Sequence, residues 1–265
     1  MKSEIVSPEI PFFIREGGGG LTPTEASRGP WGAQTLNGRV VAGLLGHEIE
    51  RVHGDPDFVP VRLTVDMFRM SMMAPVEIRT RELRTGSRIR VIEAEFWNDG
   101  TVVAHSICQF LRRGDTPPGE IWKPETWSVP NPNNLPMPTD SPVPLRGLWD
   151  VRQLTGDIRK EIRQRRAWVR EVRDLVGGEP LTPYVRAAVA ADYASPFSQM
   201  SQTGLGYINS DLTLYLHRMP TTEWIGFEVV DHGATDGISN SACRLYDEAG
   251  PIGSVTVAAL SQRRR

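Results

Sequence analysis

The chain of 265 residues lacks the features of several special protein classes. Its two cysteines, Cys108 and Cys243, are too few for a disulfide framework or a cysteine zinc site. Its longest apolar run, residues 40–45, is broken by Gly43 and is far shorter than the ~20 residues of a membrane span. The net charge of −2 gives no overall attraction to nucleic acid. We therefore expect a globular protein without a membrane span. Because no signal-peptide pattern opens the chain, we expect it in the cytoplasm.

The common catalytic signatures are also missing. There is no Gly-x-Ser-x-Gly nucleophile motif, and there is no Rossmann or Walker pattern. The five histidines include no pair at metal-ligand spacing. The sequence therefore predicts no metal and no cofactor.

Proline, by contrast, is concentrated in one stretch. Nine of the 21 prolines lie between Gly114 and Gly147. Proline disfavours both helix interiors and central strands, so this stretch is interpreted as an extended connector over residues 114–146. It separates an N-terminal domain, residues 1–113, from a C-terminal domain, residues 147–265. Trp122 and Trp127 within it predict that the connector lies against a domain surface.

The two parts of the chain repeat each other. Residues 63–70, Leu-Thr-Val-Asp-Met-Phe-Arg-Met, match residues 212–219, Leu-Thr-Leu-Tyr-Leu-His-Arg-Met, at four positions. Both segments alternate apolar and other residues, which is typical of a strand with one buried face. Turn sequences follow each segment: Asp99-Gly100 in the first half and residues 246–250 in the second. A similar final strand closes each half, at residues 102–112 and 252–262.

Each half also carries a helix pattern. Asn37 is a candidate N-cap for a helix running to about His53, with apolar residues spaced three, four and seven apart. Thr182 and Pro183 are typical of a helix start in the second half, and that helix is expected to reach about Tyr193. Strands are expected at residues 147–154 and 161–173. The predicted class is α+β, with two repeats that each wrap one long helix in a curved antiparallel sheet.

Asp192 is the most informative single residue. It is the one carboxylate in the small, apolar segment 187–196, and carboxylates are seldom buried without a partner or a purpose. Its role is either chemical or the capping of the turn before Ser195 and Pro196. The basic run from Arg159 to Arg173 holds seven basic residues and is interpreted as a solvent-facing or edge strand, with nucleic-acid binding as the alternative.

Several motifs together resemble one family. They are Gly29-Pro-Trp-Gly32, Leu36-Asn-Gly38, Ala191-Asp-Tyr-Ala194, Asn209-Ser-Asp-Leu-Thr213, Leu216-His-Arg218 and Asp247-Glu-Ala-Gly-Pro251. In order and spacing, the chain from about residue 11 to residue 263 resembles the double-hotdog acyl-CoA thioesterase-like superfamily. It is most similar to the thioesterase-like proteins of actinobacteria and more distantly to bacterial acyl-CoA thioesterase II.

The resemblance implies a site at the seam between the two repeats. In the thioesterase II branch an Asp, a Thr and a Gln orient the attacking water. The Asp corresponds to Asp192, the Thr position to Asn209, and the Gln position lies near Val257, with Thr256 beside it. The actinobacterial His-Gly-Gly motif corresponds to Asn37-Gly38-Arg39.

These residues predict a mechanism for thioester hydrolysis. Asp192 would act as general base or nucleophile, with Asn209 hydrogen bonding to the water or carbonyl. Backbone N–H groups at Asn37 and Gly38 would stabilise the oxyanion. His217 is either structural or pocket-lining. The candidate acyl-chain wall comprises Met67, Met70, Met72, Met73 and Leu216.

We therefore expect a cytoplasmic hydrolase of lipid metabolism that acts on acyl-CoA or another acyl thioester. The first alternative is a double-hotdog protein that binds acyl thioesters or lipids without turnover, which the apolar Val257 motivates. The second is nucleic-acid binding through Arg159–Arg173. The sequence leaves a homodimer or a higher oligomer open.

Overall fold

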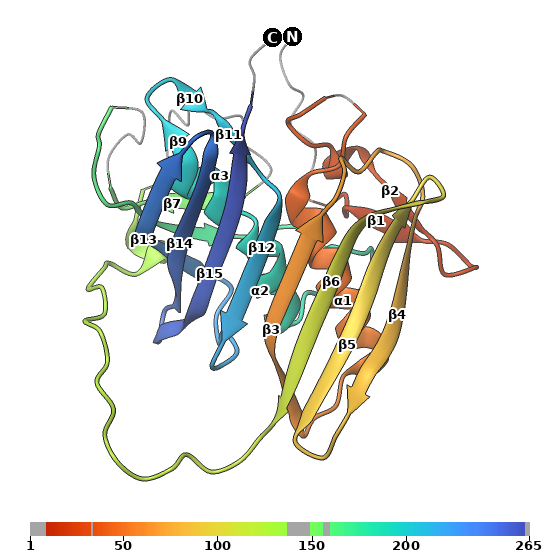
Figure 1. Ribbon diagram of the computed structural model, residues 1–265, viewed down its shortest axis with the longest axis horizontal. Helices are drawn as coiled ribbons and strands as arrows, with labels where there is room; N and C mark the ends of the chain where they lie inside the picture. Colours follow the sequence, from red (N-terminus) through yellow and green to blue (C-terminus); the bar gives the residue numbers. More distant parts are fainter. Residues whose placement is uncertain (1–8, 33, 137–148, 156–159, 263–265) are drawn as a thin grey trace.

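The computed structural model describes residues 9–32, 34–136, 149–155 and 160–262. Part of the expected connector, residues 137–146, lies outside the described residues, as do residues 147–148 of an expected strand and Arg159 of the basic run. Within the described residues, two helix-in-sheet units share one curved antiparallel sheet (Figure 1).

The first unit places helix α1 (Gly38–His53) against the concave side of its strands. In sheet order these are β1 (Phe13–Arg15), β2 (Leu21–Pro23), β4 (Val76–Thr85), β5 (Ile89–Asn98), β6 (Thr101–Arg112) and β3 (Phe58–Met67). A short 3-10 helix, η1 (Glu25–Ser27), precedes α1.

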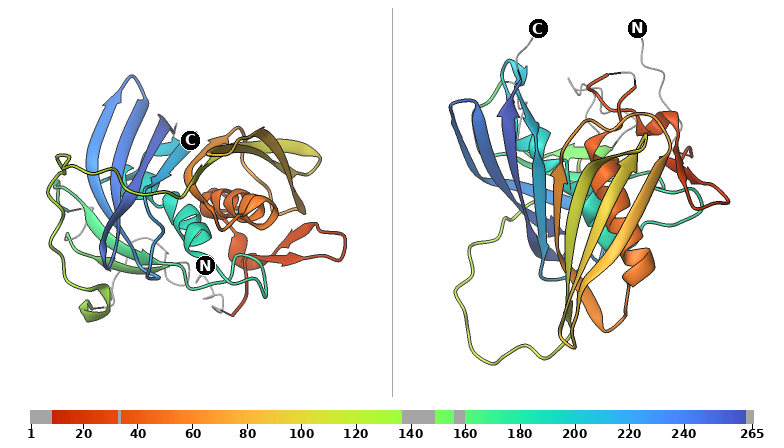
Figure 2. Two further views of the ribbon diagram at one scale, coloured as in Figure 1. Left: turned by 90° about the horizontal axis from the view of Figure 1, so that it is seen from below. Right: turned by 45° about the vertical axis from the view of Figure 1, so that its right-hand side comes forward.

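The second unit continues the same sheet. Its strands follow in the order β12 (Asp211–Leu216), β15 (Gly250–Ser261), β14 (Ile238–Asp247), β13 (Ile225–Thr235), β8 (Arg166–Arg170) and β7 (Asp150–Gln153). Strand β11 (Tyr207–Asn209) pairs with β15, and β9 (Met200–Ser201) pairs with β10 (Gly204–Leu205). Its helices are α2 (Pro183–Ala191) and α3 (Ala194–Gln199), while η2 (Pro132–Asn134) lies in the proline-rich segment. Viewed from below, α1 and α2 lie side by side inside the curve of the sheet (Figure 2, left).

The repeated segments meet at the centre of the sheet, where β3 pairs with β12. Thr64 lies opposite Thr213, its own repeat equivalent, and the Thr213 hydroxyl donates to the Thr64 hydroxyl at 3.2 Å. The flanking pairs are Leu63 with Leu214 and Val65 with Leu212. This register is what a two-fold axis between the repeats requires, because Leu63 pairs with the equivalent of Val65 and Val65 pairs with the equivalent of Leu63.

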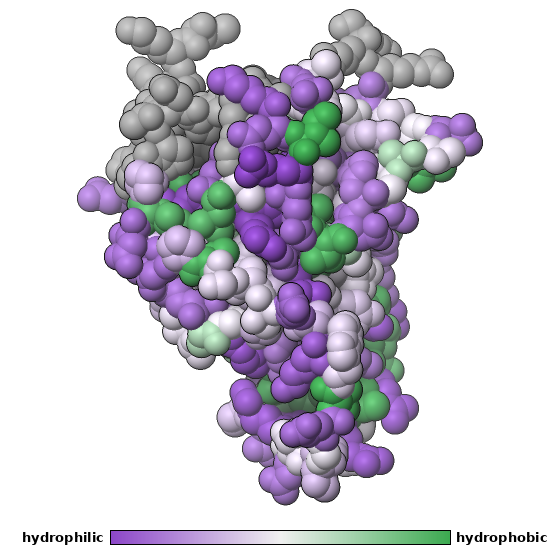
Figure 3. All heavy atoms as spheres, turned by 90° about the vertical axis from the view of Figure 1, so that its left-hand side faces the viewer, coloured by the Kyte–Doolittle hydropathy of each residue, from purple (hydrophilic) through white to green (hydrophobic). Residues whose placement is uncertain are grey.

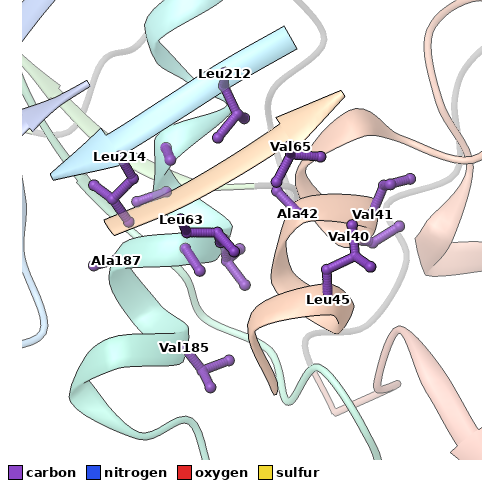
Figure 4. Packing of buried hydrophobic residues seen from close by; sticks show 14 of the residues in the cluster. Val40, Val41, Ala42, Leu45, Leu63, Val65, Val185, Ala187, Leu212 and Leu214 are labelled. Carbon is purple, nitrogen blue, oxygen red and sulfur yellow. The ribbon is translucent and has the colours of Figure 1, made fainter. Parts of the chain in front are cut away.

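One hydrophobic core spans both units. Leu63, Val65, Leu212 and Leu214 are each fully buried and pack against residues of α1 and α2 (Figure 4). Burying one such side chain contributes roughly 1.5–3 kcal/mol. The seam between the repeats is therefore part of the core.

Helix α1 begins and ends as the sequence predicts, with the Asn37 side chain accepting from the Arg39 N–H. Its expected apolar face is buried except for Val52, which is 50% exposed. The helix approaches α2 closely because it presents glycine there. A Cβ on Gly43 would lie 2.5 Å from Cγ2 of Val189.

Helix α2 starts at the predicted cap, where Thr182 accepts from the Val185 N–H at 3.2 Å. It ends at Ala191, and the sequence did not predict α3. Pro196 is tolerated in the first turn of α3 because N–H groups there have no partner within the helix.

Two other expectations need correction. Strand β8 is neither solvent-facing nor an edge, because it lies between β13 and β7 with Trp168 buried at its centre. In the proline-rich segment, Trp127 stacks on Tyr246 with ring centroids 4.2 Å apart, as expected of a connector that lies on a domain. Trp122, however, is 83% exposed, so its side chain does not pack against a domain as expected.

Candidate functional site

Asp192 lies where the two helices of the repeats meet. It is the C-cap of α2, and its carboxylate lies beside the first residue of α1. A Cβ on Gly38 would be 2.8 and 2.9 Å from the two carboxylate oxygens. Glycine is therefore needed at position 38, since any side chain there would displace the acid.

Two donors hydrogen bond to the carboxylate. The Asn209 amide donates to Oδ1 of Asp192 at 3.1 Å, and the backbone N–H of Arg39 hydrogen bonds to the same carboxylate. The Asn209 Nδ2 also lies 3.7 Å from the sulfur of Met67. The structure thus brings together five of the predicted site residues at one point, because Asn37 and Gly38 form the start of α1 beside them.

The pKa of Asp192 is raised above its ordinary value, chiefly by burial. The hydrogen bond from Asn209 and the positive field of Arg39 both act in the opposite direction. The acid also lies at the C-terminal end of α2, whose dipole disfavours an anion, and at the N-terminal end of α1, whose dipole favours one. A carboxylate with a raised pKa is a stronger base than an exposed one, as general-base catalysis requires.

Arg39 is a contributor that the sequence did not identify. Its guanidinium is fully buried, pairs with Glu171 at 2.9 Å, and lies over the rings of Phe12 and Trp149 at 4.6 and 4.4 Å. Its charge favours the ionised form of Asp192. No pattern in the sequence marks it, because an arginine in the first turn of a helix is usually exposed.

The expected oxyanion role of Asn37 is not available in this geometry. Its backbone N–H already donates to the carbonyl of Ser27 at 2.9 Å, and its side chain caps the helix. The start of α1 instead holds Asp192 through the Arg39 N–H.

Other predicted site residues lie apart from Asp192. Thr256 is exposed on the outer face of β15, whereas Val257 points inward and is 2% exposed. His217 is exposed just beyond β12, eight residues after Asn209, which is roughly 26 Å of extended strand. Leu216 lies at the same far end. Met70 and Met72 are 58% and 41% exposed, and Met73 packs against the core.

Two of the motifs that carry the resemblance, residues 216–218 and 247–251, are joined by an ion pair and hydrogen bonds. Both oxygens of the buried Asp247 accept from the Arg218 guanidinium at 2.6 Å, and one also accepts from the Thr221 N–H and hydroxyl. Arg218 further donates to the carbonyls of Gly250 and Pro251. These residues fix the turn between β14 and β15.

The arginines of the basic run are engaged within the fold. Arg166 pairs with Glu228 and Arg170 with Asp150, while Arg165 donates to the carbonyls of Phe197 and Met200. These contacts leave little of the run for a phosphate backbone. Figure 3 shows the face on the side of the C-terminal unit. The described residues on this face are mainly hydrophilic, and its hydrophobic residues form separate small groups.

Across the described residues, we find no cluster of three or more His, Cys, Asp or Glu side chains arranged to hold a metal ion. Nor does any helix in the described part of the chain have the length and apolar character needed to cross a bilayer.

Similarity to solved structures supports the fold. An acyl-CoA thioesterase II from Mycobacterium marinum is 17% identical, with a TM-score of 0.65 over 86% of this chain and 89% of that one. A conserved protein with a hotdog fold from Alicyclobacillus acidocaldarius is 18% identical, with a TM-score of 0.73 over 93% of both chains. The tesB protein of Mycobacterium avium subsp. paratuberculosis is 14% identical, with a TM-score of 0.68 over 95% and 96%. No curated protein matches this sequence.

Family models match most of the chain. The acyl-CoA thioesterase N-terminal domain matches residues 27–112, and the acyl-CoA thioesterase C-terminal domain matches residues 128–260. The two matched regions contain helices α1, α2 and α3 and the residues around Asp192, while β1 and β2 of the first unit precede them. The chain therefore belongs to the acyl-CoA thioesterase family and has its double-hotdog fold.

Proposed function

We propose that this protein hydrolyses acyl-CoA thioesters, with Asp192 as the general base. The observation that carries the proposal is the partly buried carboxylate held between the start of α1, the end of α2 and the Asn209 amide. Burial raises its pKa, which strengthens it as a base, and the hydrogen bond to Oδ1 fixes its orientation.

The reaction follows from this arrangement. Asp192 takes a proton from water while the water oxygen attacks the thioester carbonyl carbon. The tetrahedral intermediate then collapses and the carbon–sulfur bond breaks. The thiolate of CoA takes up the proton that Asp192 received, which leaves a free carboxylic acid and a thiol. Met67 beside Asn209 gives the site an adaptable apolar neighbour suited to an acyl chain.

Hydrolysis of a panel of acyl-CoAs of graded chain length tests the proposal, with release of CoA measured by a thiol reagent. We expect Asp192→Asn to reduce kcat by about 10²–10⁴-fold, because the general base is lost. Thr256→Val is the matched control, since Thr256 is exposed on the outer face and its variant should retain full activity. Equal turnover by Asp192→Asn and the unmodified protein would refute the role of Asp192.

Val257 favours a second candidate function. This apolar side chain is buried where a glutamine would be expected from the resemblance, so the protein would bind acyl thioesters without hydrolysing them. Binding of acyl-CoA by calorimetry, with no release of CoA above background at any chain length, would support this alternative.

A further inference from the structure

An unpaired donor is buried at the end of α3. Gln199 is 4% exposed, and its carbonyl oxygen accepts from the Ser239 hydroxyl at 2.9 Å. Its Nε2 is buried and has no hydrogen-bond partner within the described chain. Leaving such a donor unsatisfied costs about 1–3 kcal/mol, so its presence calls for an explanation.

Gln199 is the last residue of α3, seven residues after Asp192 in the chain. Asp192 and Tyr193 form the turn between α2 and α3, and both have backbone angles in the right-handed helical region. Ser195, in the first turn of α3, is 2% exposed.

The sheet places their partners in a matching row. Asn209 pairs with Ala259 on β15, and Ala259 pairs with Ser239 on β14. Directly paired residues project from the same face of a sheet, and two strand spacings amount to about 10 Å. Asp192 with Asn209 and Gln199 with Ser239 therefore form two polar pairs on one side of the sheet, separated by the small side chain of Ala259.

We propose that the Gln199 amide donates a hydrogen bond to the carbonyl oxygen of the acyl thioester. This inference rests on the proposed function. The two polar pairs are two strand spacings, about 10 Å, apart on the sheet, so the proposed thioester would have the attacking water on the Asp192 side and its carbonyl oxygen on the Gln199 side. The N–H groups of Asn37 and Arg39 are already engaged, which leaves at most the Gly38 N–H at the start of α1 for this role, and the Gln199 amide supplies a further donor. A preorganised donor stabilises the negative charge that develops on this oxygen.

Gln199→Met tests the assignment because methionine keeps the length of the side chain and removes the donor. We expect kcat/KM to fall about 10²-fold or more, with KM changed less than threefold and the melting temperature retained. Gln202→Met, the same change at an exposed position three residues later, is the control and should have no effect. If Gln199→Met does not fold, Gln199→Glu keeps the acceptor for Ser239 and removes the donor.

A spectroscopic readout separates this proposal from the proposed function. Infrared difference spectra are recorded for a [1-¹³C]acyl-CoA bound to Asp192→Asn, at the chain length that this variant binds most tightly. The carbonyl stretch should lie lower with Gln199 than in the double variant carrying Gln199→Met. A Gln199-dependent shift without hydrolysis by the unmodified protein refutes the proposed function and supports the donor. Hydrolysis with identical bands, or with kcat/KM of Gln199→Met within threefold of normal, overturns the donor. Absence of acyl-CoA binding overturns both.

Discussion

Replacing Gly38 by alanine gives the most direct test of how tightly Asp192 is held. The new methyl carbon would lie 2.8 and 2.9 Å from the carboxylate oxygens, whereas ordinary contacts begin near 3.4 Å. The carboxylate must therefore move by about 0.6 Å. A displacement of about 1 Å in a catalytic group can cost about 10²-fold in rate, so we expect roughly a tenfold loss in kcat/KM for acyl-CoA. Alanine is also a better helix former than glycine by about 0.5–1 kcal/mol. This gain opposes the strain of the close contact, so the free energy of unfolding should change little.

Gly46→Ala provides the matched control for this prediction. Gly46 also faces α2 from α1, and a Cβ there would lie 3.0 Å from the Cβ of Ala188. This variant strains the contact between the two helices without touching Asp192. Activity retained by Gly38→Ala, or lost equally in both variants, would show that the close approach of Gly38 to Asp192 does not position the acid.

Three further predictions concern pH and stability. Asn209→Leu removes a hydrogen bond that lowers the pKa of Asp192, so the acid limb of kcat/KM should move to higher pH; an unmoved limb in the pH–rate profile would exclude this coupling. Because the raised pKa of Asp192 makes its ionised form costly, Asp192→Asn should be at least as stable as the unmodified protein near neutral pH, and any advantage should shrink as pH falls through the folded-state pKa towards 3.8, as followed by denaturant unfolding. Arg218→Met should lower the free energy of unfolding by about 3 kcal/mol because it leaves the buried Asp247 carboxylate without its main partner. Although burial opposes it, hydrogen bonding from Arg218 lowers the pKa of Asp247, so the loss should be largest above the ordinary Asp pKa and diminish in acid; urea titrations at several pH values check this.

Regular periodicity and capping chemistry made much of the fold predictable. Asn37 and Thr182 are side chains whose oxygens satisfy the first N–H groups of a helix, and both helices begin where they predict. Asp99 and Gly100 both adopt positive φ, as their hairpin turn requires. The repeat also placed β3 and β12 as equivalents, although their direct pairing is a long-range property that local patterns do not contain.

The candidate site was only partly predictable. Asp192 was identifiable because a carboxylate stands out among alanines, and the family resemblance pointed to Asn209. Thr256 was assigned to the site because it is adjacent to Val257. Neighbouring residues on a strand point to opposite faces of the sheet, so Thr256 lies on the outer face while Val257 points inward. Arg39 and Gln199 are buried by packing between distant segments, so neither shows a local signal.

The surroundings of Asp192 draw on both repeats. Gly38 and Met67 come from the first unit, while Asp192 and Asn209 come from the second. Neither unit alone carries all four. Separating the units would also expose β3 and β12, the two strands that pair at the seam. A substitution in one repeat therefore alters the surroundings of a side chain more than a hundred residues away in the sequence, and a single chain supplies both sides of the site.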